Sequence, residues 1–461
     1  MGKIVTFYSY KGGVGRSFLL ANVAATLARW GARVLCVDWD LEAPGLDAYF
    51  RPWLSPGTPE STGLVSLVER LTVSNEDPDT GFIAEFGQDI VLPDCEGSLR
   101  LLSSGVGDPS YFQRIQALDW ERLYSERQLG SRLEWLRDAW SAEFDFILID
   151  SRTGFSDTGG ICTVQMPDVL IFTFAPNSQN IDGVTEAVRR IVDNRNDFPY
   201  DRERLLTIPV LTRFDQRTEY QLAQDWLREN IDRLEPFTTG WLNKEVSLRD
   251  LMDRTRIPYY SYWSFGERLP VIDEQSQSSD YISYYFQTIA SLIVYDAAKT
   301  DTLIRERDSY VNQARLLIRP RKYKYDVFVS YSHVDKPLAT HVIQELKRHG
   351  LSVFSDSELI QGERLNSQLL KAIDQSQNML MLLSDNDRLY QQEHGAHFFR
   401  QTLESPNSIQ RRLIPIRTNE SVVLEGFLAS LQSFDAVAVS QPDFLDRLAD
   451  EFAESRYSVR E

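Results

Sequence analysis

A glycine-rich loop from Lys11 to Ser17, with the sequence KGGVGRS, constrains the fold of this chain more than any other feature. It follows an apolar run at residues 4–8 and precedes a helical pattern that runs from Phe18 to Trp30. Glycines let a backbone wrap closely around an anion, and the start of a helix adds partial positive charge. The order of strand, loop and helix therefore predicts a phosphate-binding loop (P-loop) at the edge of a parallel α/β sheet.

Strand and helix patterns alternate along the whole chain, which predicts an α/β fold throughout. In the first 300 residues we expect strands at Ile4–Tyr8, Val34–Val37, Phe144–Asp150, Val169–Ala175 and Leu206–Thr212. In the last third we expect strands at Tyr325–Tyr331, Ser352–Phe354, Met379–Leu383, Leu413–Arg417 and Ala436–Ser440. Helices are expected there at Asp335–His349, at Asn366–Gln375 and from Pro442 onward. We therefore predict a P-loop domain at 1–300, a charged helical connector at 301–322 and a smaller α/β domain at 323–461.

Composition restricts the partners and the compartment. The net charge of −18 disfavours the basic surface that nucleic-acid binding needs. No apolar run is long enough for a membrane span, so no membrane partner is expected. The 3 cysteines form neither a disulfide framework nor a metal site, which fits a cytoplasmic protein. The 5 histidines show no ligand spacing and are interpreted as surface or packing residues.

Carboxylates follow two of the predicted strands. Asp38 and Asp40 come after Val34–Val37, and Asp150 ends the strand that begins at Phe144. The carboxyl ends of parallel strands lie beside a phosphate loop, where carboxylates can hold Mg²⁺ through water and orient an attacking water. Ser17, at the start of the helix, is placed to bind the same ion. The sequence thus predicts a site for a nucleoside triphosphate and Mg²⁺.

These motifs resemble the deviant-Walker ATPases of the ParA/MinD type, whose signature is KGGxG(K/R)(S/T). The closer resemblance is to a KGGVGR subfamily, which also has VDWDLEAPGL, LIDSRTG and a YWSFGERL-like segment at Tyr262–Leu269. The resemblance implies that Lys11 reaches the partner's phosphates in a nucleotide-sandwich dimer. It also implies that Asp38 and Asp40 serve Mg²⁺ and the nucleophilic water, and that Asp150 is the Walker B carboxylate. The expected nucleotide-binding residues are Lys11, Gly12, Gly13, Val14, Gly15, Arg16, Ser17, Asp38, Asp40 and Asp150, with Ser17, Asp38 and Asp150 at the metal, partly through water.

The sequence departs from the family pattern at two positions. Arg16 stands where the common pattern has lysine, so fast hydrolysis is not implied and a slow ATPase is expected. The asparagine that commonly reads adenine has Leu211–Arg213 as its nearest counterpart, which leaves ATP or another nucleoside triphosphate open.

Other residues near the predicted site keep two interpretations each. Glu42 is a local cap or surface acid, or else a site residue, and Arg152 is an ion-pair donor or a phosphate sensor. The aromatic residues Tyr262, Trp263 and Phe265 are interpreted as core packing in preference to a base-stacking platform.

The last domain resembles a TIR domain. The segment YDVFVSYS at Tyr325–Ser332, the run SVFSD ending at Asp356 and the loop IQGERL around Gly362 carry the resemblance. It implies a flavodoxin-like fold, and it implies either an adaptor role or cleavage of NAD⁺ at the nicotinamide glycosidic bond. In enzymatic members a glutamate follows a tryptophan in the helix after the third strand. Here that helix has no tryptophan, and Glu393 is interpreted equally as the catalytic glutamate or as an exposed helix carboxylate.

The resemblance places Tyr331, Ser332, Asp356 and Gly362 in the NAD⁺ pocket, with ordinary strand-end and turn chemistry as the alternative.

Together the two resemblances imply a bacterial antiphage defence effector. In it, nucleotide binding controls self-association into a dimer or higher oligomer, and assembly switches on NAD⁺ hydrolysis to nicotinamide and ADP-ribose, with a defence-system partner or phage component as trigger. The alternatives are a non-catalytic TIR scaffold under the same nucleotide switch, and a partitioning protein of the ParA/MinD manner. The trigger, the oligomer stoichiometry and the choice between hydrolysis and cyclisation of NAD⁺ are left open.

Overall fold

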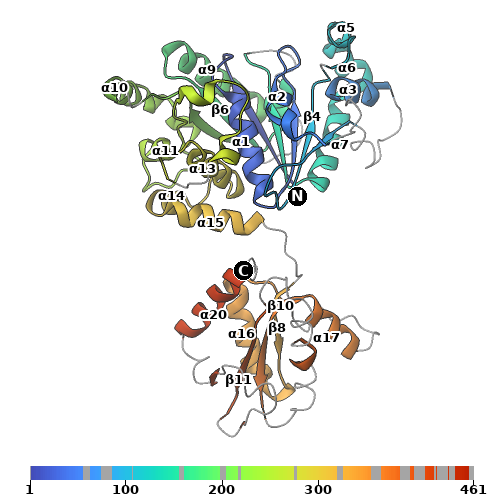
Figure 1. Ribbon diagram of the computed structural model, residues 1–461, viewed down its shortest axis with the longest axis vertical. Coiled ribbons are helices and arrows are strands. Elements are labelled where there is room, and N and C mark those ends of the chain that lie inside the picture. The colour runs from blue at the N-terminus through green and yellow to red at the C-terminus, as the bar shows by residue number, and fades with distance from the viewer. Residues whose placement is uncertain are drawn as a thin grey trace. The chain divides into compact units, whose positions relative to one another are not determined.

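The computed structural model divides the chain into two compact units, Met1–Pro320 and Arg321–Glu461. Each unit has a sheet and a core of its own (Figure 1). The residues that the structure describes are 2–55, 63–73, 86–105, 107–154, 160–197, 204–215, 220–274, 278–318, 325–354, 365–384, 395–398, 411–419, 422, 434–435 and 442–455. In this part of the chain, no helix is both long and apolar enough to cross a membrane.

The first unit is built on a seven-stranded sheet, counted over the described residues, in the order β3-β4-β2-β5-β1-β6-β7. Its strands are β1 Lys3–Ser9, β2 Arg33–Asp38, β3 Gln88–Ile90, β4 Ser98–Leu102, β5 Phe146–Asp150, β6 Val169–Phe174 and β7 Leu206–Leu211. All neighbours pair in parallel except β3 with β4. The central strands are buried on both faces, which explains why they read as unbroken apolar runs.

All five strands predicted for this region are confirmed within two residues at each end, and the predicted α/β class is correct. The strands β3 and β4 were not predicted. The first has only three residues and pairs only at the edge of the sheet, and the second is interrupted by Arg100.

Helices cover both faces of this sheet (Figure 1). They are α1 Arg16–Arg29, α2 Leu46–Phe50, α3 Gly63–Val73, α5 Tyr111–Ala117, α6 Trp120–Arg127, α7 Leu129–Glu143, α9 Ser178–Asn196, α10 Tyr220–Asn230, α11 Leu248–Thr255, α12 Pro270–Asp273, α13 Ser283–Val294, α14 Thr300–Arg305 and α15 Arg307–Ile318. One core cluster contains α1 and α13, and a second contains α3 and α7.

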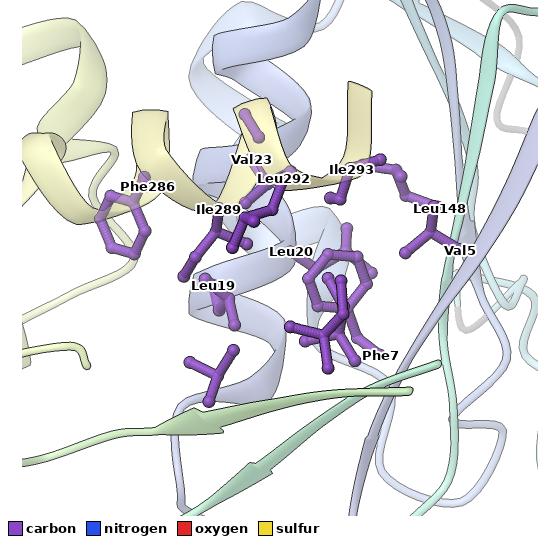
Figure 2. Packing of buried hydrophobic residues seen from close by; sticks show 14 of the residues in the cluster. Val5, Phe7, Leu19, Leu20, Val23, Leu148, Phe286, Ile289, Leu292 and Ile293 are labelled. Atoms are coloured by element: carbon purple, nitrogen blue, oxygen red, sulfur yellow. The ribbon is translucent and has the colours of Figure 1, made fainter. Parts of the chain in front are cut away.

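The helix after the phosphate loop, α1, is locked in place by α13. Figure 2 shows side chains of α1, α13 and the strands gathered in one cluster, with Leu19 and Leu20 on one side and Ile289 and Leu292 on the other. All four are fully or almost fully buried. Each such side chain contributes about 1.5–3 kcal/mol by burial, so the start of α1 is held at a fixed position relative to the strand ends.

Helices α14 and α15 belong to the first unit, whereas we expected a separate connector at 301–322. Tyr310 and Ala314 are fully buried, and the Arg307 guanidinium donates to the Tyr284 carbonyl at 2.6 Å and to Thr288 Oγ1 at 3.0 Å. The charged composition that suggested a connector hid these inward positions. The structure therefore extends the first unit to about residue 320.

The second unit has a parallel five-stranded sheet, again counted over the described residues, in the order β12-β11-β10-β8-β9. The strands are β8 Tyr325–Ser330, β9 Val353–Phe354, β10 Ser376–Leu383, β11 Leu413–Arg417 and β12 Phe434–Asp435, and the helices include α16 Lys336–Arg348, α17 Leu365–Asp374 and α20 Pro442–Ser455. Numbered from β8, the strand order is 2-1-3-4-5, which is the flavodoxin-like order that we expected. The last strand was expected at Ala436–Ser440, outside the described residues, and the structure has it at Phe434–Asp435.

Candidate functional site

The glycine-rich loop joins β1 to α1 in a conformation that only glycine adopts without strain. Gly13 has φ of +75° and Gly15 has φ of +88°, and a Cβ at either position would meet no atom within 4 Å. The constraint is therefore the backbone angle, not crowding. Among the described residues, no side chain caps the start of α1, and its first turn has no acidic residue. The backbone N–H groups of this turn can therefore receive a phosphate.

The base of the loop is tied to β7. Thr212, just after that strand, donates from Oγ1 to the carbonyl of Val14 at 2.6 Å. Val14 is 3% exposed, whereas Gly12 and Gly13 at the tip are exposed. Lys11 is half-buried, and its side chain has no hydrogen bond or ion pair with the described residues. The loop thus has an anchored base and an open tip that carries an uncommitted cation.

Arg16, the first residue of α1, lies in a buried ion cluster with two of the predicted carboxylates. Its Nε donates to Asp150 Oδ1, and its Nη2 donates to Asp40 Oδ2 at 2.8 Å. Ser17 donates from Oγ to the other oxygen of Asp150 at 2.5 Å. Arg16 and Asp40 are 7% exposed and Asp150 is 1% exposed. Burial acts to lower the pKa of Arg16, but the two carboxylates outweigh it and raise that pKa.

Asp38 has different hydrogen-bond partners from Asp40. Its carboxyl accepts the backbone N–H groups of Asp40, Gly45 and Leu46 at 3.1–3.2 Å, so it shapes the loop that follows β2. Burial, together with the nearby charge of Asp150, raises the pKa of Asp38 to about 8. Burial also raises the pKa of Asp150, although Arg16 and Ser17 oppose this.

The donor set fits Mg²⁺ in the manner of P-loop proteins. The Ser17 hydroxyl and the Asp150 carboxylate are adjacent, and Mg²⁺ usually takes one or two such ligands and completes its shell with phosphate oxygens and water. No cluster of three or more His, Cys, Asp or Glu side chains suited to a metal occurs within the described residues. These residues would therefore hold the ion together with a nucleotide and not alone.

Two residues with open interpretations pair with each other. Arg152 Nη2, after β5, lies 2.5 Å from Glu42 Oε2, after β2. Both side chains are partly exposed, at 34% and 57%. The pair links the two loops that follow the carboxylate-bearing strands, which favours the ion-pair interpretation of Arg152 over a phosphate sensor.

A cavity of about 180 Å³ lies next to the loop and is lined by aromatic side chains. Phe18, Tyr49, Tyr260 and Trp263 contribute rings, and Arg213 lines it with a left-handed backbone, φ +53°. Flat apolar walls beside a phosphate loop suit a nucleobase. A larger cavity of about 330 Å³ lies beside Trp241 at the start of β7. That strand has six residues, so this second cavity is roughly 20 Å away from phosphates held by the loop.

Tyr262, Trp263 and Phe265 were predicted to pack in the core, which is wrong for two of the three. Tyr262 is 60% exposed and Phe265 is 76% exposed, because the short helical turn Ser261–Ser264 directs them outward. Trp263 is half-buried and lines the cavity. Phe18, Tyr49 and Tyr260 were not predicted as cavity residues. The dense run of aromatics at 259–265 could have indicated Tyr260, and the position of Phe18 directly after the loop could have indicated that residue.

Two strands of the second unit, β8 and β10, are followed by neutral polar groups. Tyr331 packs partly against the core, and Ser332, at 3% exposed, accepts the N–H of Asp335 on its carbonyl at 2.9 Å. Ser384 follows β10, is 5% exposed, and has no partner for its Oγ among the described residues. The other predicted pocket residues, Asp356, Gly362 and Glu393, lie outside the described residues.

Comparisons with known sequences and structures find proteins that are similar to parts of this chain. The cytosolic Fe-S cluster assembly factor CFD1 of Chaetomium globosum is 30% identical over 154 residues, which are 33% of this chain and 43% of that protein. The disease resistance protein RUN1 of Vitis rotundifolia is 36% identical over 69 residues, which are 14% of this chain and 5% of that protein. The chain thus spans less than half the length of either relative. A ParA family ATPase from Chlorobium tepidum TLS, among the solved structures, covers 62% of this chain and 99% of its own, with 20% identity and a TM-score of 0.41.

Two family models match, one in each unit. The TIR domain model matches residues 327–449. The model described as CobQ/CobB/MinD/ParA nucleotide binding domain matches residues 5–255, which is more than half of the chain and includes the whole loop and all three carboxylates. The chain therefore belongs to the CobQ/CobB/MinD/ParA nucleotide-binding family and carries a TIR domain in its second unit.

Proposed function

We propose that this chain is a defence effector in which nucleotide binding by the first unit controls self-association, and self-association switches on NAD⁺ cleavage by the TIR domain. The observation that carries the proposal is the buried cluster of Arg16, Ser17 and Asp150 beside an open phosphate loop, in the same chain as a TIR domain. A charged site of this kind suits a triphosphate with Mg²⁺. The relative RUN1 is a disease resistance protein, which supports a defence role with an outside trigger.

Lys11 is the residue we assign to the dimer contact. Its side chain lies at the loop tip without a partner among the described residues, while Arg16 serves the carboxylates of its own chain. One cation therefore stays inside the site and another remains for the phosphates held by a second copy. We expect ATP hydrolysis to be slow, because Arg16 places a planar guanidinium where the common pattern has the compact ammonium of lysine.

In the TIR domain we assign Glu393 to the reaction. The bond between nicotinamide and ribose C1 breaks, nicotinamide leaves with the bonding electron pair, and water adds to C1 and releases a proton to solvent. A carboxylate near C1 stabilises the positive charge that develops on the ribose, as in glycoside hydrolysis. Tyr331, Ser332, Asp356 and Gly362 are assigned to the NAD⁺ pocket.

The first experiment follows nicotinamide release from NAD⁺ by the full chain, with and without ATP and Mg²⁺. We expect release only when the nucleotide is present, and we expect Glu393→Gln to lower the rate by at least about 100-fold, as loss of a charge-stabilising group does. Glu345→Gln, on α16, is the matched control, because it removes one helix carboxylate whose ion-pair partner is its neighbour Arg348. No release under any assembled condition would leave the second function, a non-catalytic TIR scaffold, which the missing tryptophan near Glu393 favours.

The second experiment measures mass by light scattering after addition of ATP and Mg²⁺. Lys11→Ala is expected to bind the nucleotide but to stay monomeric. Lys244→Ala removes an exposed lysine elsewhere in the first unit and should dimerise like the unmodified protein. An unchanged dimer in Lys11→Ala would contradict the assignment of Lys11.

A further inference from the structure

The two carboxylates at the carboxyl end of β2 make different contacts. Asp38 accepts backbone N–H groups, whereas Asp40 binds the guanidinium of Arg16 at 2.8 Å. The family resemblance assigned both to Mg²⁺ and the nucleophilic water. The geometry gives Asp40 a separate task, because its contact is with the P-loop arginine and not with Ser17.

The position of Asp40 is set from both sides. Its own N–H donates to Asp38 Oδ1 at 3.2 Å, and the N–H of Trp39 donates to the carbonyl of Asp150 at 2.9 Å. The Trp39 side chain is 1% exposed, so this short segment is fixed in the core. Asp40 and Asp150 therefore bind two different nitrogens of the planar Arg16 guanidinium and hold it in one orientation.

The guanidinium of Arg16 still has unused hydrogen-bonding capacity. Its Nη1 is buried and has no partner among the described residues, although the side chain is 7% exposed. An orphan donor on a buried cation is costly, and it points to an acceptor that arrives from outside the chain. At the first residue of a P-loop helix, the acceptor with the matching charge is a phosphate oxygen.

We infer that Asp40 is a positioning residue that holds Arg16 against Asp150, so that Arg16 turns to the nucleotide phosphates only when Asp150 is engaged with Mg²⁺. This inference rests on the proposed nucleotide binding. If Arg16 left the cluster alone, Asp150 and Asp40 would remain as buried charges without a counterion, which is strongly unfavourable. When Asp150 and Ser17 turn to the metal, that penalty falls and the arginine is released. The binding of nucleotide and the binding of Mg²⁺ are therefore coupled, and Asp40 sets the strength of this coupling.

The test is the affinity for ATP measured by calorimetry, in Mg²⁺ and in EDTA, for the full chain and for Asp40→Asn. We expect Asp40→Asn to bind ATP about tenfold more tightly in EDTA, because the loss of one charge-assisted hydrogen bond frees Arg16. In Mg²⁺ we expect the affinity of Asp40→Asn for ATP to change by less than about threefold. The difference in ATP affinity between Mg²⁺ and EDTA should therefore be smaller in this variant. Asp47→Asn is the matched control, since Asp47 lies at the start of α2 and pairs with exposed Arg51 at 2.9 Å.

A double-mutant cycle tests whether Asp40 affects the affinity for ATP through Arg16. Lysine has no planar fork and cannot bridge both carboxylates, so the effect of Asp40→Asn in EDTA should fall below about twofold in an Arg16→Lys background. An effect that persists unchanged beside Arg16→Lys would overturn the inference. It would also be overturned if Asp40→Asn lost ATP affinity in Mg²⁺ as strongly as Ser17→Ala, because Asp40 would then be a ligand. If the unmodified chain binds no nucleotide in either buffer, the proposed function itself fails.

Discussion

The two units present the carboxyl ends of parallel strands in different ways. In the first unit these ends carry charges that are buried and paired, with Arg16 between Asp40 and Asp150. In the second unit the residues that follow β8 and β10 include neutral, buried groups, Ser332 and Ser384. A buried charge must have its counterion in place when the chain folds, whereas a buried hydroxyl can remain without a partner at a modest free-energy cost. The first site is therefore largely organised by the chain itself.

The largest effect should come from removing the central cation of the first site. Arg16→Ala leaves Asp40 and Asp150 buried without a counterion, so we expect the first unit to lose about 3–5 kcal/mol of stability and nucleotide binding to disappear. Hydrogen exchange followed by mass spectrometry can locate this loss. The second unit should keep its exchange protection, because it has its own core.

Arg16→Lys separates charge from geometry. It keeps the positive charge but cannot donate to both carboxylates in one plane, so its destabilisation should be clearly smaller than that of Arg16→Ala. Equal losses for the two variants would mean that the fork geometry, and not the charge, holds this cluster together.

A core substitution in each unit tests whether the two regions are stable independently. Phe286→Ala removes a fully buried ring that lies edge-on to Phe18, with centroids 5.4 Å apart, and should destabilise the first unit by about 3–5 kcal/mol. Leu380→Ala, in β10, should destabilise the second unit by about 2–5 kcal/mol. Calorimetry should show each variant shifting a different transition. If one variant shifts both transitions equally, the two units are not independent in stability.

In the first unit, the closeness of the loop to the strand-end carboxylates could be predicted from the sequence, but the pairing of these side chains could not, for a physical reason. The loop, its glycines and α1 are contiguous, and the apolar runs of β1, β2 and β5 identify strands whose carboxyl ends must meet. The pairing of Arg16 with Asp40 joins residues 24 positions apart on different elements. Nothing in a D-x-D pattern tells which aspartate turns toward the arginine and which toward the backbone.

Local composition also hid two features that depend on tertiary packing. Residues 300–318 look charged, yet Tyr310 and Ala314 are fully buried against the first unit. In contrast, Tyr262 and Phe265 look like core residues and are exposed, because their segment forms a short turn at the surface. In each case the direction of a few side chains decides whether they are buried or exposed. These segments are too short for a helix or strand periodicity to reveal that direction.

A smaller effect is expected where the second unit leaves a hydroxyl unpaired. Ser384→Ala removes the buried Oγ that has no partner among the described residues, so the stability of the second unit should change by less than about 1 kcal/mol. If this hydroxyl serves the proposed NAD⁺ pocket, the KM for NAD⁺ should rise while the stability stays constant. A large loss of stability instead would show that the neutral strand end is as tightly organised as the charged one.

The smallest effect should come from an exposed charged pair at the amino ends of β2 and β5, opposite the phosphate loop. Asp145, before β5, binds the Arg33 guanidinium at 2.7 Å, and both side chains are about half exposed. Burial acts to raise the pKa of Asp145, but the hydrogen bonds from Arg33 outweigh it and lower that pKa. A lowered pKa means that the pair stabilises the fold above the pKa of the unfolded chain, about 4, and that this stability is lost as the pH falls below it.

Asp145→Asn should therefore cost about 0.2–1 kcal/mol at pH 7 and less at pH 3, measured by urea unfolding at both values. The same comparison in 1 M salt should reduce the cost further, because solvent and ions screen an exposed pair. The contrast with Arg16→Ala then isolates burial, since both substitutions break an arginine–aspartate pair in the same sheet. A cost for Asp145→Asn as large as that for Arg16→Ala would mean that burial does not explain why the phosphate-loop cluster is organised in advance.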